Sequence, residues 1–503
     1  MKVTLIRPPA YSAGVMGAQR VPFLGILYVG AAAREAGHTV DIVDMCGEDV
    51  LHTEIVYDKY VAYGTPFSRL DTRTKASDVF GFTCTFSQDW VFNRELIQYV
   101  RKLYPNSIFV AGGEHISAAP EYCLQDCPEL DVCIIGEGEE VFTQLLSVLE
   151  KGGDWSEVPS LVYSHPKGKE IRRTPRANRI KNIDNIPRPA WDLIPVENYL
   201  SEGLNYHIKR GRTMPMLASR GCPHKCTFCS SQNMWTRHWI PRTPSLVVDE
   251  MEYYIKKYSA NNFVFSDLTA VVHRNGIIEF CNEILRRKLK ITWQLPTARS
   301  EAMDYEILKL MYQAGCRDLD FAIESGSAEV LRSVNKGNNP EKIFSLIRDG
   351  LNIGMNLSVN IVLGLPQEGL RGFFKTYWLM MKLAFIGLQE VNAFPFVPYP
   401  GSPLFEEFLS KGKIKLNDEF FLSLFGYADL SRAVSWSEAF GPKTLLSLRL
   451  FLMSSFYIVM FLSHPSRIIR LISNVVRGVS TTKLEGVLGR VFQNVKVCFF
   501  RRV

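Results

Sequence analysis

The sequence predicts an α/β protein in which a doubly wound parallel sheet is followed by a complete or partial (β/α) barrel and a helical tail. Short apolar runs alternate with helical patterns from Lys2 to about Lys151 and again from Arg212 to about Lys413. The stretch between them is rich in proline, and the chain ends in apolar, basic segments with helical periodicity. A length of 503 residues suits two to four domains. We expect the boundaries 1–151, 152–206, 207–413 and 414–503.

The first unit has the strand and helix alternation of a doubly wound sheet. Its expected strands are VTLI, TVDIV, DVFGFT, SIFVAGG and DVCIIG, and its expected helices lie near 25–36, near 88–103 and after the last strand. Two glycine pairs follow strand ends: Gly112 with Gly113, and Gly136 with Gly138. Ligands of such sheets bind at these ends, where glycine lets the backbone approach them closely. The alternative is that these glycines only make turns.

The second unit repeats a strand followed by a helix about six times. Its expected strands are PMLAS, NNFVFSD, ITWQL, DLDFAIES, LSVNIVLG and EVNAFPF, with helices near 245–258, 275–287, 305–314, 342–351 and 374–386. Such repeats predict a barrel whose chemistry lies at the carboxyl ends of its strands. The segment 152–206 has too weak a periodicity for a long element, and we expect a packed linker there.

The tail holds most of the positive charge. The net charge is +7, whereas residues 441–503 contain ten Lys or Arg and one acid, so the rest of the chain carries 7 − 9 = −2. A nucleic-acid partner is therefore not expected. The apolar run 450–462 is shorter than the ~18 residues that a spanning helix needs. After it, Arg467, Arg470 and Arg477 recur at helical spacing and predict a basic amphipathic helix, which either contacts a membrane surface or packs on the barrel.

Cysteine usage indicates a reducing compartment. Eleven cysteines are too few for a disulfide scaffold in 503 residues, and the first residues, MKVTLIRPPA, lack the apolar core of a secretion signal. We therefore expect a cytoplasmic protein whose tail provides any contact with the inner face of the membrane. Eight cysteines are dispersed and are expected to be mostly buried small apolar residues: Cys46, Cys84, Cys123, Cys127, Cys133, Cys281, Cys316 and Cys498.

The other three cysteines share one loop. The run RGCPHKCTFCSS directly follows the expected strand PMLAS and places Cys222, Cys226 and Cys229 in a C-x3-C-x2-C spacing. Three thiolates on one loop can hold three corners of an iron–sulfur cluster and leave the fourth iron open for a reaction. The alternative is zinc completed by His224 or a distant residue. His224 lies between two of the ligands, where it would strain a tetrahedral site.

The cysteine motif, with Phe228 before its third cysteine, resembles that of the radical S-adenosylmethionine (SAM) superfamily. Further segments resemble the successive strand-end motifs of that family, in order: FSD, AGCRDLDFAIESGS, NKG, NIVLGLPQE and PYPGSPLFE. The first unit, with PFLGILYVGAAAREAGHTVDIVD, FVAGGEHIS and DVCIIGEGEEVFTQLL, resembles the flavodoxin-like cobalamin-binding domain that precedes the barrel in one large subgroup. The resemblance covers about residues 1–413.

The resemblance implies three cofactors: a [4Fe-4S] cluster on the three cysteines, SAM chelated to the open iron, and cobalamin. It also implies that the cluster reduces SAM to an adenosyl radical, which abstracts hydrogen from the substrate. By position, Asp267, Glu324 and Ser325 would face the methionine and ribose of SAM, and Gly364 would let the adenine approach its strand. The alternatives are that Asp267 caps the next helix and that Glu324 pairs with an arginine such as Arg299.

Two features depart from the family pattern. The cobalamin signature Asp-x-His-x-x-Gly is absent, because the spacing from Asp49 to His52 does not match it. We therefore expect cobalamin contacts from the backbone of Gly112, Gly113, Gly136 and Gly138 rather than a histidine on cobalt, and we expect His115 to lie at the surface. The second departure is Gln367 in LGLPQE, where relatives often have glycine, and it weakens the expected adenine contact.

The leading hypothesis is a cobalamin-dependent radical SAM enzyme that methylates an unactivated carbon of a lipid-like or tetrapyrrole substrate. An oxidative ring cyclase, such as the anaerobic magnesium-protoporphyrin monomethyl ester cyclase, is the alternative within the subgroup. Two alternatives lie outside this subgroup. A tRNA methylthiotransferase needs three further cluster cysteines near its N-terminus, and a non-catalytic cobalamin sensor has no use for an open iron. The expected partners are a small-molecule or lipid-like substrate and an electron donor such as a reductase, flavodoxin or ferredoxin.

Overall fold

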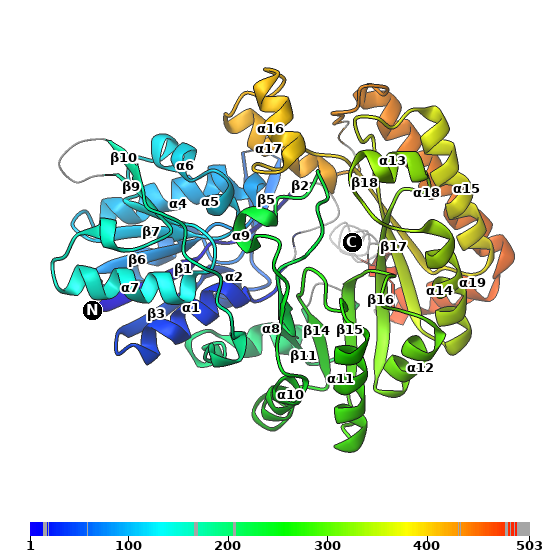
Figure 1. Cartoon of the computed structure of the whole chain (residues 1–503), viewed down its shortest axis with the longest axis horizontal. Helices are drawn as coiled ribbons and strands as arrows, with labels where there is room; N and C mark the ends of the chain where they lie inside the picture. The colour runs from blue at the N-terminus through cyan, green and yellow to red at the C-terminus, as the bar shows by residue number, and fades with distance from the viewer. Residues whose placement is uncertain are drawn as a thin grey trace, which may run out of the picture.

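The computed structural model contains two large sheets flanked by helices, one in each half of the molecule (Figure 1). It describes residues 1–13, 18, 20–57, 59–164, 170–204, 208–430, 432, 434–477, 481–482, 484–486 and 488–489. The N-terminal half is blue to cyan in Figure 1, and the second half is green to orange. Cys498 and the end of the tail lie outside the described residues.

The N-terminal sheet has the strand order β10-β9-β8-β7-β6-β1-β3. Its five parallel strands are β1 (Lys2–Arg7), β3 (Thr39–Asp44), β6 (Val79–Thr83), β7 (Ile108–Gly112) and β8 (Val132–Ile134). Its helices include α1 (Leu24–Glu35), α4 (Trp90–Leu103), α5 (Glu114–Ala118), α6 (Pro120–Asp126) and α7 (Gly138–Glu150). The order of the parallel strands is that of a flavodoxin-like sheet, in which ligands bind at the strand ends beside the switch between β1 and β6. The predicted fold class of this unit is confirmed.

Two small sheet additions were not predicted. A separate antiparallel sheet consists of β2 (Ala10–Ala13), β4 (Thr53–Val56) and β5 (Tyr60–Tyr63). The strands β9 (Leu161–Ser164) and β10 (Ile171–Arg173) extend the first sheet in antiparallel orientation, so the segment 152–206 is not a linker throughout. Cross-strand pairing between segments decides whether such short additions form.

The second sheet has six parallel strands in chain order, as predicted. They are β11 (Thr213–Met216), β14 (Asn262–Phe265), β15 (Thr292–Ala298), β16 (Cys316–Glu324), β17 (Asn356–Leu363) and β18 (Glu390–Pro395). The helices between them are α10 (Pro244–Tyr258), α11 (Arg274–Arg286), α12 (Tyr305–Gln313), α13 (Ala328–Ser333), α14 (Pro340–Ile353) and α15 (Leu370–Phe385). Among the described residues β11 and β18 form the two edges, so the barrel is partial.

The segment after the barrel does not form one unit. Helices α16 (Pro403–Ser410) and α17 (Asp418–Ser423) share a core with the N-terminal sheet and its helices, and Arg94 on α4 pairs with Asp418 at 2.7 Å. Helices α18 (Pro442–Ser463) and α19 (Ser466–Arg477) instead lie on the outer side of the barrel beside α15 (Figure 1). After the barrel, the chain therefore packs first against the N-terminal domain and then, through α18 and α19, against the barrel again.

Helix α18 is longer than the apolar run 450–462 suggested. It spans 22 residues because its first two turns include Lys443 and a buried Arg449. In the described part of the chain it alone is long and apolar enough to cross a membrane. One face of α18 is nevertheless buried against the barrel, through residues spaced three or four apart: Leu445, Arg449, Leu452, Phe456 and Met460. The predicted basic helix corresponds to α19.

Candidate active site between the two domains

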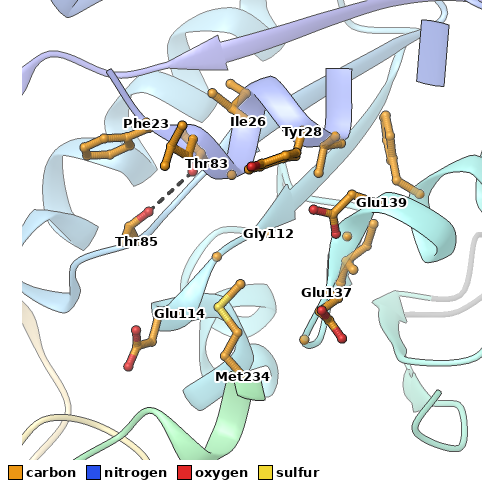
Figure 2. A pocket seen from close by; sticks show the side chains of 18 of the residues that line it. Phe23, Ile26, Tyr28, Thr83, Thr85, Gly112, Glu114, Glu137, Glu139 and Met234 are labelled. Atoms are coloured by element: carbon orange, nitrogen blue, oxygen red, sulfur yellow. Dashed lines mark hydrogen bonds between the residues drawn. The ribbon is translucent and has the colours of Figure 1, made fainter. Parts of the chain in front are cut away.

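A pocket lies at the carboxyl ends of the N-terminal strands and is closed on its other side by barrel residues (Figure 2). Its volume is about 290 Å³, near the lower end of the ~300–1000 Å³ of ordinary small-molecule sites. The N-terminal wall is largely apolar but includes Glu114, Glu137 and Glu139. The barrel contributes residues at the ends of its first two strands: Leu217, Ser266 and Leu268. A ligand in this pocket therefore contacts both units.

The four predicted glycines all line the pocket. Gly113 has φ 120°, and a Cβ atom there would lie 2.5 Å from the carbonyl oxygen of Cys84, so its backbone requires glycine. A Cβ atom on Gly112 would meet nothing within 4 Å. Gly113 therefore serves the turn, as the alternative supposed, whereas Gly112 leaves space at the strand end that a large ligand can fill.

The pocket is also lined by a short helix that the sequence analysis missed, α9 (Gln232–Trp235). Figure 2 shows Met234 on this helix between Glu114 and Glu137. The side chain of Glu114 is tied to the same segment, because Ser230 donates a hydrogen bond to it at 2.7 Å. Burial raises the pKa of Glu114, and this hydrogen bond opposes the rise. The sequence signal for Met234 is its position close to the cysteine motif, because it follows the third cysteine by five residues.

A buried ion-pair cluster joins the two units at the pocket wall. Arg220, in the short strand β12 (Ser219–Arg220), bonds to Glu139 at 2.6 Å and to Glu137 at 3.2 Å. Glu137 also pairs with Arg179 at 2.6 Å. The guanidinium of Arg220 lies 5.0 Å from the ring centre of Tyr28. The end of β8 is thereby fixed to the strand that leads into the cysteine loop two residues later.

The three motif cysteines lie on the loop between β12 and α9 and are partly exposed. Among the described residues no three His, Cys, Asp or Glu side chains surround one point closely enough for a single metal ion. A [4Fe-4S] cluster does not require that, because each thiolate binds a different iron. Burial raises the pKa of all three thiols, and the charges of Arg299 and Lys336 oppose this at Cys222 and Cys226. The donor set and its cationic surroundings therefore suit an anionic thiolate cluster.

Asp267, at the end of β14, faces the start of the cysteine loop. Its carboxylate accepts a hydrogen bond from the hydroxyl of Ser219 at 2.5 Å and one from the backbone N–H of Ala218 at 3.1 Å. Burial raises its pKa to about 6, and these hydrogen bonds oppose the rise. Asp267 thus connects β14 to β12 instead of capping the following helix, and its neighbours Ser266 and Leu268 line the pocket.

The other predicted SAM contacts differ in their surroundings. Glu324, at the end of β16, pairs with Lys336 at 2.9 Å and not with Arg299, which pairs with Glu301. Ser325 is fully buried and lies 3.0 Å from the hydroxyl of Thr376 on α15. These contacts leave Glu324 with Lys336 beside the cysteine loop and turn Ser325 toward a barrel helix.

Gly364 has a neighbour that the sequence did not suggest. Its φ is 76°, and a Cβ atom there would lie 2.6 Å from the side chain of Leu445 on α18. The space beside this glycine is therefore filled by the tail. Its N–H donates to the buried carboxylate of Glu368 at 2.6 Å.

The expectation that His115 lies at the surface was wrong. Its ring is buried, with Nδ1 2.9 Å from Ser87 Oγ and Nε2 3.4 Å from Cys123 Sγ, and burial lowers its pKa to about 3. His115 is not among the residues that line the pocket. The seven dispersed cysteines within the described residues are all buried, as predicted.

Comparison with known proteins agrees with this architecture. Residues 216–376 match the radical SAM superfamily, and residues 17–146 match the B12 binding domain. The two matched segments contain the cysteine loop and the four pocket glycines. The chain therefore carries a radical SAM domain and a B12-binding domain, which confirms the predicted family resemblance and the predicted cofactors: a [4Fe-4S] cluster, SAM and cobalamin.

Individual relatives are similar to the chain over most of its length. An uncharacterized methyltransferase of Pyrococcus horikoshii is 29% identical over 81% of this chain and 83% of its own length. The anaerobic magnesium-protoporphyrin IX monomethyl ester cyclase of Rubrivivax gelatinosus is 27% identical over 82% and 71%. The radical SAM methyltransferase TsrM of Kitasatospora setae, solved with cobalamin and a [4Fe-4S] cluster bound, shares the fold with a TM-score of 0.62 and 18% identity, over 82% and 78%. The chain is thus a radical SAM enzyme that carries a B12-binding domain.

Proposed function

We propose that this enzyme methylates an unactivated carbon of a lipid-like or tetrapyrrole substrate. The single observation that carries the proposal is the shared pocket, because the glycine loops of the B12-binding domain and the segment after the cluster cysteines open onto one cavity. When bound, the cluster supplies the electron that cleaves SAM, and cobalamin supplies the methyl group. A substrate that reacts with both cofactors must reach the space between them, and we assign that space to the shared pocket.

In this proposal the residues of the chain bind and orient the cofactors. Cys222, Cys226 and Cys229 hold the cluster, while Arg299 and Lys336 offset its negative charge. Asp267 fixes the loop that carries the cysteines. The pocket wall of the B12-binding domain is largely apolar and keeps water away from the reacting carbon.

The corrin would lie against the backbone at Gly112, Gly113, Gly136 and Gly138, which all line the cavity. On the SAM side, Glu324 is placed beside the cysteine loop by its pairing with Lys336. We propose no adenine contact in the space beside Gly364, because the side chain of Leu445 occupies that space. Ser325 acts by positioning, since its hydroxyl bonds to α15 and to the backbone N–H of Ser327.

Ring cyclisation is the second candidate function, and the cyclase relative supports it. The two reactions differ in their by-products. Methylation consumes one SAM as methyl donor and one as radical source, so S-adenosylhomocysteine and 5′-deoxyadenosine form in equal amounts. Cyclisation yields 5′-deoxyadenosine without S-adenosylhomocysteine. Both need an external one-electron donor, for which we propose a flavodoxin, a ferredoxin or a reductase in the cytoplasm.

The first experiment is an anaerobic absorption spectrum of protein reconstituted with iron, sulfide and hydroxocobalamin and then desalted. We expect a broad band near ~400 nm that is lost when all three motif cysteines are replaced by alanine and kept in the matched control Cys281→Ala. Corrin bands should persist in all three proteins. Loss of the corrin from the wild type would refute the methyl-transfer proposal, whereas loss of the ~400 nm band alone would refute the cluster assignment.

The second experiment identifies the reaction. The reconstituted enzyme is incubated with a reductant, a membrane lipid extract or magnesium protoporphyrin monomethyl ester, and SAM bearing a CD3 group. A product heavier by one CD3 group, with equal amounts of the two SAM by-products, supports methyl transfer. Ring closure without S-adenosylhomocysteine would overturn it in favour of cyclisation.

A further inference from the structure

The outer side of the barrel presents an extended apolar surface. Of the twenty-two large apolar side chains that are exposed in the described residues, twelve lie on α15, α18 and α19. The most exposed include Trp378, Phe385, Ile458, Leu462, Ile469 and Ile472. The three helices lie side by side at the edge of the molecule that is farthest from the B12-binding domain in Figure 1. We call the exposed faces of these three helices the outer apolar surface.

The helices of this surface are held in place by the barrel. Arg449 on α18 is buried and donates hydrogen bonds to the backbone carbonyls of Ala393, Tyr427 and Asp429 at 2.7 to 3.2 Å. The rings of Tyr377 on α15 and Phe451 on α18 stack with their centres 5.1 Å apart. Since α18 is fixed by its buried face, its apolar outer face is a permanent feature of the folded enzyme.

The start of α19 is fixed in the same way. Arg467 donates hydrogen bonds to the carbonyls of Gly387 at 2.6 Å and Leu388 at 3.3 Å, and His464 lies 3.0 Å from the carbonyl of Phe385. These contacts satisfy carbonyl groups at the end of α15. They aim the apolar face of α19, with Ile469 and Ile472, away from the barrel.

The charge of this surface has one sign. The three helices contain eight Lys or Arg and no Asp or Glu in 50 residues. Arg449 and Arg467 bond to the barrel, Lys375 pairs with Glu329 of α13, and Arg470 pairs with Glu485. The remaining cations include Lys382, Lys443 and Arg477, which are exposed. Large apolar groups accompanied by cations and no anions are the pattern of an interfacial membrane site.

We propose that the outer apolar surface docks the enzyme on one leaflet of an anionic lipid bilayer. A second copy of the chain is a poorer occupant, because it would bring two cationic surfaces together without an acid on either. The helices lie on the membrane instead of crossing it, since α18 would have to abandon Arg449 and its buried leucine and phenylalanine contacts to span. The docked surface starts beside the strand ends of the barrel, where Leu445 of α18 covers Gly364.

The test is sedimentation of the full chain with vesicles, using phosphatidylcholine alone or mixed with phosphatidylglycerol. We expect binding to the anionic vesicles and at least about tenfold weaker binding to the neutral ones, because each basic residue contributes attraction at an anionic surface. The variant Leu462→Asp/Ile469→Asp changes two side chains that are 79% and 73% exposed. It should lower the partition coefficient at least about tenfold, since both side chains would otherwise enter the lipid.

The matched control is Leu51→Asp/Ile55→Asp, which changes side chains of 62% and 71% exposure on the N-terminal domain. It should bind vesicles like the wild type. Equal loss in both variants, or no binding of the wild type to anionic vesicles, would overturn the proposal. So would concentration-dependent dimerisation without lipid that only the Leu462/Ile469 variant abolishes, because it would assign the surface to a second copy.

A second readout does not depend on a destabilising charge. Trp378 is 61% exposed on α15, so vesicles with brominated acyl chains should quench part of the tryptophan fluorescence, and Trp378→Phe should remove that part. Quenching that is unchanged in Trp378→Phe would contradict the placement of α15 at the lipid. The proposal stands apart from the reaction, because cluster and corrin spectra test the function without lipid and vesicle binding tests the surface without cofactors.

Discussion

Arg220 provides the sharpest test of how the two units are joined. Its side chain is 5% exposed, and it contacts Glu139, which is 7% exposed, at 2.6 Å. In the described part of the chain Arg220 is the cation that Glu139 pairs with, whereas Glu137 also has Arg179. Arg220→Ala therefore leaves one buried carboxylate uncompensated. Removing one partner of a buried pair costs about 3–5 kcal/mol of unfolding free energy.

This loss is large enough to measure. With a urea dependence of roughly 3 kcal/mol per M, about 4 kcal/mol lowers the unfolding midpoint by roughly 1 M. Replacing both partners, as in Arg220→Met/Glu139→Leu, should restore most of that stability, because apolar residues of similar size remove the uncompensated charge. The exposed pair of Arg172 and Glu170, with side chains 48% and 70% exposed, is the control, and Arg172→Ala should cost less than about 1 kcal/mol.

The assay is urea unfolding followed by fluorescence, together with retention of cobalamin after desalting. We expect Arg220→Ala to lose both stability and cobalamin, since Arg220, Glu137 and Glu139 all line the pocket. A midpoint as high as that of the wild type would refute the reasoning. So would a double variant as unstable as the sum of the two single variants, because the charges would then be energetically independent.

Further predictions concern a buried acid and the pocket glycines. Burial raises the pKa of Glu368 to about 7, and the N–H of Gly364 opposes the rise. The folded state therefore keeps a proton that the unfolded state releases above its ordinary pKa near 4.5, so stability falls by about 3 kcal/mol as the pH rises from 4.5 to 7. Glu368→Gln should flatten this decline in urea midpoints measured at pH 5 and pH 8, and an unchanged slope would contradict the assignment. Gly113→Ala should destabilise the protein by about 2–4 kcal/mol, because its Cβ atom would overlap the Cys84 carbonyl. Gly112→Val should instead leave the unfolding midpoint near that of the wild type and weaken cobalamin retention, because its side chain would enter the pocket. Equal losses of stability in the two glycine variants would contradict the presence of open pocket space beside Gly112.

The sequence by itself determined the two parallel sheets, their main helices and the cysteine loop. Apolar runs of four to eight residues mark buried parallel strands, and helical periodicity marks the helices that cover them. The spacing of Cys222, Cys226 and Cys229 is local, so no knowledge of the fold was needed to find it. The pocket glycines were found for the same reason, since each follows a strand end.

Only the tertiary structure decided which distant residues meet at the site. The pairing of Arg220 with Glu139, the burial of His115 under Phe421 and the contact of Leu445 with Gly364 each join segments that are far apart in the chain. The short strands β9 and β10 and the return of α17 to the N-terminal sheet depend on such contacts as well. Periodicity reports how a segment buries its own face, whereas the identity of the surface that covers it depends on packing between segments.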